Sequence, residues 1–263
     1  MAKLCPLFSG SSGNSYYIGS GGEGILVDAG RSAKQLEGAL RENELDIKSI
    51  RAIFVTHEHS DHIQGLRVLA SRYQIPVYSS QGTLEALCDM EVLNGKYPAY
   101  VAEEKGICVG GMCVVPFRTS HDARESVGYC VHTADGRKAV IATDLGYITP
   151  NVRQAVKGAD VAVLESNHDV GMLQNGSYPY PLKRRILSKS GHLSNTACAQ
   201  ELSGFVLSGT RRFVLAHLSD ENNLPQLAYQ TSLCCLTQCG MKEGVDFKLL
   251  VASRECTGMA VVY

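Results

Sequence analysis

Short apolar runs alternate with segments of helical periodicity along the first third of the chain. Runs bounded by turn residues are typical of buried strands, and they occupy residues 4–8, 16–18, 23–28, 50–55 and 75–80. The Gly- and Ser-rich stretch between the first two runs is expected to close a hairpin. Apolar positions recur every three or four residues over 32–45, and again in a helix that we expect to start near Asp61 with Ser60 as its N-cap.

The rest of the chain repeats this alternation after two hairpins. Gly-Gly and Asp-Gly turns lie within the alternating segments 106–117 and 128–143, which predicts two antiparallel pairs. Helices are expected at 149–158, 194–207 and 227–240, strands at 159–165, 211–217 and 246–253, and a loop up to about residue 181. No linker rich in Pro, Ser or charge interrupts the pattern, so we expect an α/β fold in which residues 1–263 form one domain of two similar halves.

The composition is typical of a globular protein, but it does not indicate a substrate. The 263 residues carry a formal net charge of −1 and are 44% hydrophobic, so we expect a sizeable core, and the overall charge announces no partner. The first six residues lack a signal-peptide pattern and no apolar run approaches the roughly 18 residues of a membrane span, which predicts a cytoplasmic protein without membrane contact. The ten cysteines form no Cys-x-x-Cys pair and are expected to be reduced thiols, including Cys234, Cys235 and Cys239 in an apolar helix.

Residues 56–62, THEHSDH, concentrate side chains that ligate metals. His57 and His59 can converge only in a loop or at the exit of a strand, because residues two apart on a helix point in different directions. A zincin helix is excluded, since the position four after His57 is Asp61. With His62 the segment offers four ligands, more than one tetrahedral ion takes from such a segment, which predicts two ions. Further ligands are expected from residues that each follow an apolar strand: His121, Asp144 and His217.

The order His-x-His-x-Asp-His, followed by His, Asp and His at strand ends, resembles the metallo-β-lactamase fold superfamily over nearly the whole chain. The resemblance implies a four-layer αββα sandwich, with Asp28 at the end of ILVDAG as a supporting residue. It assigns His57, His59 and His121 to one metal ion, Asp61, His62 and His217 to a second, and Asp144 to a bridge between them. Imidazole-rich ligation favours zinc, and the carboxylates are also compatible with manganese or iron.

Such a binuclear site predicts hydrolysis by a metal-bridging hydroxide, because two metal ions lower the pKa of bound water and bind the substrate oxygen. The motifs SGSSGNS, THEHSDH, TSHDA, TDLG, LESNHD, GHLSN and HLSDENN, in this order over residues 4–223, most resemble the YycJ/VicX/WalJ-type exonuclease branch. That branch implies a DNA exonuclease acting 5′→3′ in repair. A small-molecule hydrolase acting on a cyclic phosphodiester or a lactone is the alternative, suggested by the near-neutral charge.

The expected proton donor lies outside the metal motifs. SGHLSN and VLESN resemble loops of the RNase Z branch, which implies that His192 is the general acid and that Glu165 orients it, while Asp61 takes part in catalysis as well as in metal binding. Candidate substrate contacts are Asn14, through the backbone of the Gly-rich turn, and Asn167, His168 and Ser194. Two basic clusters, Lys183–Arg185 and Arg211–Arg212, support DNA as the partner. Strand residue His132 is expected to have no function, and no protein partner is indicated.

Overall fold

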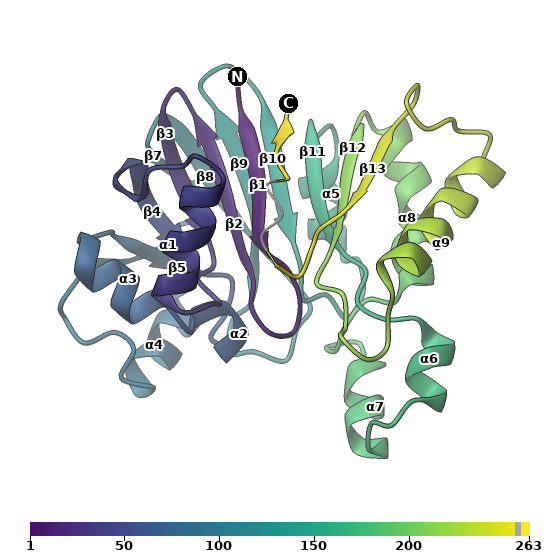
Figure 1. Ribbon diagram of the computed structural model, residues 1–263, viewed down its shortest axis with the longest axis horizontal. Coiled ribbons are helices and arrows are strands. Elements are labelled where there is room, and N and C mark those ends of the chain that lie inside the picture. The colour runs from purple at the N-terminus through teal and green to yellow at the C-terminus, as the bar shows by residue number, and fades with distance from the viewer. Residues whose placement is uncertain (256–258) are drawn as a thin grey trace.

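A computed structural model describes residues 1–255 and 259–263 of the chain, and two sheets dominate it (Figure 1). The first sheet contains β1 (Lys3–Phe8), β2 (Ser15–Ser20), β3 (Glu23–Val27), β4 (Ile50–Phe54), β5 (Val77–Ser79), β6 (Ala99–Val101) and β14 (Val261–Val262). Its strand order is β14-β1-β2-β3-β4-β5-β6. The strands β3 to β6 run parallel, and β1 and β2 form the expected hairpin around the Gly-rich turn.

The second sheet has the same number of strands and comes from the second half of the chain. It contains β7 (Ile107–Val109), β8 (Met112–Arg118), β9 (Val127–Thr133), β10 (Lys138–Ala142), β11 (Val161–Glu165), β12 (Arg212–Ala216) and β13 (Lys248–Val251). Its strand order is β13-β12-β11-β10-β9-β8-β7. The strands β10 to β13 are parallel, and both expected hairpins, β7–β8 and β9–β10, are present.

Helices cover the outer face of each sheet. Those of the first half are α1 (Ala33–Glu42), the 3-10 helix η1 (Ile47–Ser49), α2 (Ser60–Ile63), α3 (Leu66–Tyr73) and α4 (Gln81–Asp89). The second sheet is covered by α5 (Pro150–Val156), α8 (Asn195–Leu207) and α9 (Pro225–Gln238), whereas α6 (Val170–Asn175) and α7 (Tyr180–Ile186) project from the body of the sandwich (Figure 1). One buried cluster fills the space between the sheets, a second lies under α1, α3 and α4, and a third lies under α5, α8 and α9. The fold is therefore the expected αββα sandwich of two similar halves.

The parallel strands explain why polar side chains gather at one edge of the sandwich. The strands β3, β4, β10, β11 and β12 are almost entirely buried, which accounts for their uninterrupted apolar runs. Parallel strands that share an outer helix layer end at the same edge, where ligand sites of α/β proteins collect. Asp28, Asp144 and His217 follow β3, β10 and β12 there, and each has a left-handed backbone, with φ of 64°, 58° and 56°. Such strained residues concentrate at functional sites.

Two sequence expectations about helices were wrong. The single helix predicted after the histidines is broken into α2 and α3 at Gly65, and its N-cap position is His59 rather than Ser60. The Gly65 N–H donates to the Ala29 carbonyl at 2.9 Å, and a Cβ at Gly65 would lie 2.2 Å from the carbonyl oxygen of Arg31. This close approach fixes a break that helical periodicity cannot reveal. The predicted loop up to residue 181 contains α6, whose start Asp169 caps by accepting from Met172 N–H.

The structure also tests what the sequence suggested about Arg211 and Arg212, the cysteines and membrane spans. Arg211 and Arg212 stand at the start of β12, and therefore at the edge of the sheet opposite His217, where they donate to backbone carbonyls. The two arginines therefore lie away from the site and do not support DNA binding there, contrary to the expectation from the sequence. Within residues 1–255 and 259–263 every cysteine is a free thiol, and the side-chain groups able to hold a metal include none of them. Every helix in these ranges is too short or too polar to cross a bilayer.

Candidate metal centre

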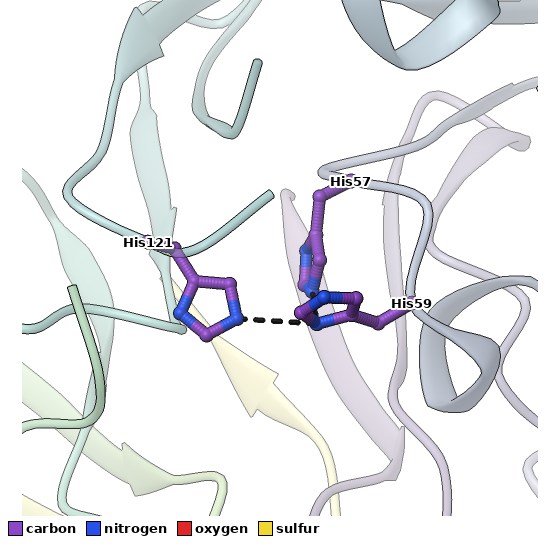
Figure 2. Close-up of side chains that lie close together, drawn as sticks. All are labelled: His57, His59 and His121. Carbon is purple, nitrogen blue, oxygen red and sulfur yellow. Dashed lines mark hydrogen bonds between the residues drawn. The ribbon is translucent and has the colours of Figure 1, made fainter. Parts of the chain in front are cut away.

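Three histidines from two segments face one another at the edge where the strands end (Figure 2). β4 delivers the chain to His57 and His59, and β8 delivers it to His121. The Nδ1 atom of His59 lies 3.1 Å from His57 Nε2 and 3.2 Å from His121 Nε2. Four ligands around a zinc ion, with Zn–N bonds of about 2.0–2.1 Å, lie roughly 3.3 Å apart. The three nitrogens are thus spaced as ligands of one tetrahedral ion.

A second group shares the same space. The Nε2 atoms of His62 and His217 each lie 3.5 Å from Asp61 Oδ2. Asp144 stands between the two groups: one carboxylate oxygen lies 3.3 Å from His62 Nε2, and the other lies 3.4 Å from His217 Nδ1 and 3.7 Å from His121 Nε2. All seven predicted ligands therefore converge, although they come from four separate segments of the chain.

The chemistry of this donor set fits divalent metal ions. Asp144 Oδ2 and His217 Nε2 are buried and have no hydrogen-bond partner within the described residues, which is costly for polar atoms unless an ion or water satisfies them. The predicted ligands, together with Glu165 and His192, form four overlapping groups, and within each group the ligand atoms all lie within 4.8 Å of one another. Oxygen and imidazole ligands in this combination suit zinc, manganese or iron.

The electrostatic environment of the site also favours bound cations. Burial by itself would lower the pKa of His217, but Asp144, Asp61 and Glu165 outweigh it and raise that pKa to about 10. Burial likewise opposes the charged form of His62, and three carboxylates, Asp144 first, raise its pKa well above the usual value. The buried carboxylates thus attract positive charge into this region. Protons and metal ions compete for the same imidazole nitrogens, so metal binding is expected to strengthen as pH rises.

Asp28 holds one of these histidines from behind. Its buried carboxylate accepts the N–H and the hydroxyl of Thr56 at 2.8 and 2.9 Å and lies 2.8 Å from His62 Nδ1. A carboxylate at Nδ1 fixes the imidazole tautomer and turns Nε2 toward the metal position. The structure agrees with the supporting position that the resemblance gave to Asp28, whereas the contribution of Thr56 was not foreseen.

Replacing this support is expected to weaken metal binding without removing a ligand. In Asp28→Asn a neutral amide replaces the carboxylate at His62 Nδ1 and no longer fixes the tautomer of the ring. The affinity for zinc should therefore fall about 10–100-fold. Competition titration with a chromogenic chelator measures the change. The matched control is Asp46→Asn, since Asp46 caps the surface turn η1 and should leave affinity unchanged. Equal affinities of Asp28→Asn and the parent protein would contradict the supporting function.

Glu165 connects the site to His192. This buried residue ends β11, and its Oε1 atom lies 2.7 Å from His192 Nδ1 and 2.9 Å from His217 Nδ1. Its Oε2 atom accepts the backbone N–H groups of Leu145 and Leu193 at 2.6 and 3.1 Å. Burial would raise the pKa of Glu165, but His192 and His217, through their charge and their hydrogen bonds, hold it below the usual range. Glu165 is thus an anion that orients both rings, whereas the sequence pointed only to its pairing with His192.

The four candidate substrate contacts occupy different surroundings. The Asn14 backbone N–H donates to Asp61 O at 2.8 Å, so it is not directed at a metal position as expected, while its side chain lies 3.3 Å from Asp61 Oδ2. Asn167 donates to the His217 carbonyl, and Ser194 caps α8 by accepting from Ala197 N–H. Both thereby position elements that carry the site. His168 differs: both of its ring nitrogens are buried without a partner in the described residues, and burial lowers its pKa to about 4.

Asn223 is a further positioning residue, which the sequence did not reveal. Asn223, fully buried, donates to the carbonyls of Ser166 and Asn167 at 2.9 and 3.0 Å and bonds with Asn195. It thereby ties the loop after β11 to the start of α8, the two segments that flank Glu165 and His192. The motif HLSDENN contained this residue, but nothing in its residue types identified the loop that it contacts.

Comparisons with known proteins agree with this architecture. A family model described as the beta-lactamase superfamily domain matches residues 24–218. The chain is 41% identical over 250 residues to "Exodeoxyribonuclease YycJ" of Bacillus anthracis, covering 92% of both chains. It is 39% identical over 255 residues to "Exodeoxyribonuclease WalJ" of Streptococcus pneumoniae, covering 94% of this chain and 93% of the relative. The crystal structure of the metallo-beta-lactamase fold protein YhfI from Bacillus subtilis superposes with a TM-score of 0.73 over 99% of this chain and 98% of that chain, at 15% identity, and thus shows the shared fold.

Proposed function

The chain belongs to the beta-lactamase superfamily and is a metal-dependent hydrolase, and we propose that it is a binuclear DNA exonuclease acting 5′→3′ in cytoplasmic DNA repair. The observation that carries the choice of substrate is the His192–Glu165 pair, which stands beside the metal-capable residues with an Nδ1–Oε1 distance of 2.7 Å. A phosphodiester has a poor alkoxide leaving group, so its cleavage benefits from a placed proton donor. The two relatives named as exodeoxyribonucleases support DNA as the substrate.

In this proposal the protein residues divide into two metal sites that share a carboxylate. His57, His59 and His121 would hold one ion, Asp61, His62 and His217 the other, and Asp144 both. Bound divalent ions would supply a nucleophile at neutral pH and stabilise charge on a phosphate oxygen. Zinc suits the imidazole-rich set best, and manganese or iron would also fit.

His192 and Glu165 are the residues proposed to protonate the leaving group. His192 holds Nδ1 against Glu165, which leaves Nε2 as the nitrogen that protonates the departing oxygen of the substrate. Glu165 stabilises the charged imidazole before this transfer, as a carboxylate behind a catalytic histidine does. The side chain of His192 is 15% exposed, so it can recover a proton from solvent after each cleavage. His168, whose ring nitrogens have no partner in the described residues, is proposed to contact the substrate. Asn14, Asn167 and Ser194, the other three candidates, are proposed to act by positioning the segments around the site, because their polar groups bond to those segments.

A direct assay tests the proposal. The protein, loaded separately with zinc, manganese or iron, is incubated with DNA labelled at either the 5′ or the 3′ end, beside the Asp61→Ala variant. A 5′→3′ exonuclease releases the 5′ label first as a short product, and Asp61→Ala should release little or none. Absence of DNA cleavage with every metal would refute the nuclease assignment, and earlier release of the 3′ label would refute the polarity. A cyclic dinucleotide and a lactone, included in parallel, test the small-molecule alternative.

A further inference from the structure

One stretch beside the site departs from the charge balance of the chain. Between Val170 and Gln200 the sequence contains four Lys and Arg residues and no Asp or Glu, although the chain as a whole has a net charge of −1. This stretch includes α6, α7 and the turn that leads to His192. We call α6, α7 and residues 187–191 the arm. Segments of one charge sign next to a hydrolytic site attract a substrate of the opposite sign.

The arm projects from the body of the sandwich, below the edge at which the strands end (Figure 1). Three contacts fasten its base to the site. Arg185 pairs with both carboxylate oxygens of Asp122, His121 Nδ1 lies 3.1 Å from Gly191 O, and the His192 N–H donates to Ile186 O at 2.9 Å. A strand held along the arm would therefore enter the site next to the proposed proton donor.

The charges on the arm are mostly uncompensated. Lys183 donates to the carbonyls of Gln174 and Gly176, which orders its side chain but leaves its charge in place. Within the described residues no carboxylate lies within 4.0 Å of Lys183, Arg184 or Lys189, so only Arg185 of the basic residues is neutralised by an ion pair. Arg184 and Lys189 are exposed and free to contact phosphates.

An aromatic ring accompanies these charges. Tyr180 is 73% exposed at the start of α7, and the guanidinium carbon of Arg184 stands 6.0 Å from its ring centroid. A large exposed ring beside a cation is a combination with which proteins hold single strands, because bases stack on the ring and phosphates pair with the cation. A duplex offers a free base face only at its terminal pair, whereas each unpaired base of a single strand can offer one to Tyr180. The combination thus favours an unpaired strand over duplex DNA or an acidic protein surface.

We propose that the arm holds the unpaired part of a DNA strand as it enters the site, with Tyr180 stacking against a base and Arg184 and Lys189 contacting phosphates. This inference rests on the proposed nuclease function and adds to it a preference for single-stranded over blunt double-stranded ends. Tyr180, Arg184 and Lys189 act in binding, while His192 at the base of the arm acts in the chemistry.

Two variants test the arm: Tyr180→Ala, and the double variant Arg184→Ala/Lys189→Ala. With a short single-stranded oligonucleotide as substrate, Tyr180→Ala should raise KM at least about 5-fold, as expected for the loss of one stacked base. The plot of log binding constant against log salt has a negative slope, and in the double variant this slope should be less steep by about 1.4, or about 0.7 for each lost phosphate contact. Both should hydrolyse bis(p-nitrophenyl) phosphate at the parent rate, because this small ester does not reach the arm.

The matched control is Lys48→Ala/Lys157→Ala, which also removes two exposed cations but before the starts of β4 and β11, at the edge opposite the site. It should leave KM and the salt slope at the parent values. If the arm variants cleave and bind the oligonucleotide like this control, the arm proposal is wrong, although the nuclease proposal stands. If the parent protein itself cleaves no DNA, the nuclease proposal fails first. Equal losses on blunt duplex and single-stranded DNA would refute the preference for unpaired ends.

Discussion

Asp144→Ala is expected to lower the rate of DNA hydrolysis about 10³-fold or more. It should also reduce the metal content below two ions per chain. The Asp144 carboxylate lies within 3.3–3.7 Å of ligand nitrogens from both groups. In the proposed assignment its loss would therefore remove an oxygen ligand from each metal position. Metal ions contribute several kcal/mol to stabilising the transition state, and each 1.36 kcal/mol corresponds to about tenfold in rate. Elemental analysis of the purified protein gives the metal content, and DNA cleavage gives the rate.

Backbone strain must be separated from loss of the ligand, because Asp144 has a φ of 58°. Asn tolerates the left-handed conformation better than Ala, so Asp144→Asn should relieve the strain and still lose metal. The matched control is Glu44→Ala, an exposed acidic residue that also has a φ of 58° and lies after α1, away from the site. It should retain both metals and full activity. Normal metal content in Asp144→Asn would show that the carboxylate is not a bridging ligand.

His192→Ala is expected to keep both metals and to lose about 10²–10⁴-fold in the rate of DNA cleavage, the usual contribution of a general acid. His192 is not among the seven residues assigned to metal, and its Nδ1 is engaged by Glu165 at 2.7 Å. With bis(p-nitrophenyl) phosphate the loss should be much smaller, because p-nitrophenolate leaves without protonation. A comparison of the two substrates measures the proton transfer independently of metal binding.

The control for this variant is His132→Ala, which removes an exposed histidine from β9 and should change neither rate. Two outcomes would contradict the proton-donor assignment. One is equal loss on both substrates, which would indicate damage to the nucleophile or to metal binding. The other is reduced metal content, which would move His192 among the ligands; its ring does lie in one metal-capable group, with Asp144, Glu165 and His217.

The sequence by itself determined which residue types take part and in which order. Apolar runs and helical periodicity predicted most strands and helices, because side-chain patterning reports local burial. The spacing of His57, His59, Asp61 and His62 excluded a helical zinc motif and required ligands from elsewhere. Asp28 and Glu165 were also identified, because ILVDAG and VLESN resemble motifs of known families. These features are all encoded within short segments.

Only the tertiary structure decided what those segments do to one another. The order and direction of the strands in the second sheet gave β8, β10 and β12 the same direction, which brought His121, Asp144 and His217 to one edge and placed Arg211 and Arg212 at the other. The break at Gly65 follows from the carbonyl of Arg31, and the second bond of Glu165, to His217, depends on the pairing of β11 with β12. The physical reason is common to all three: a local pattern specifies which face of a segment is buried, whereas the register between segments fixes which atoms meet.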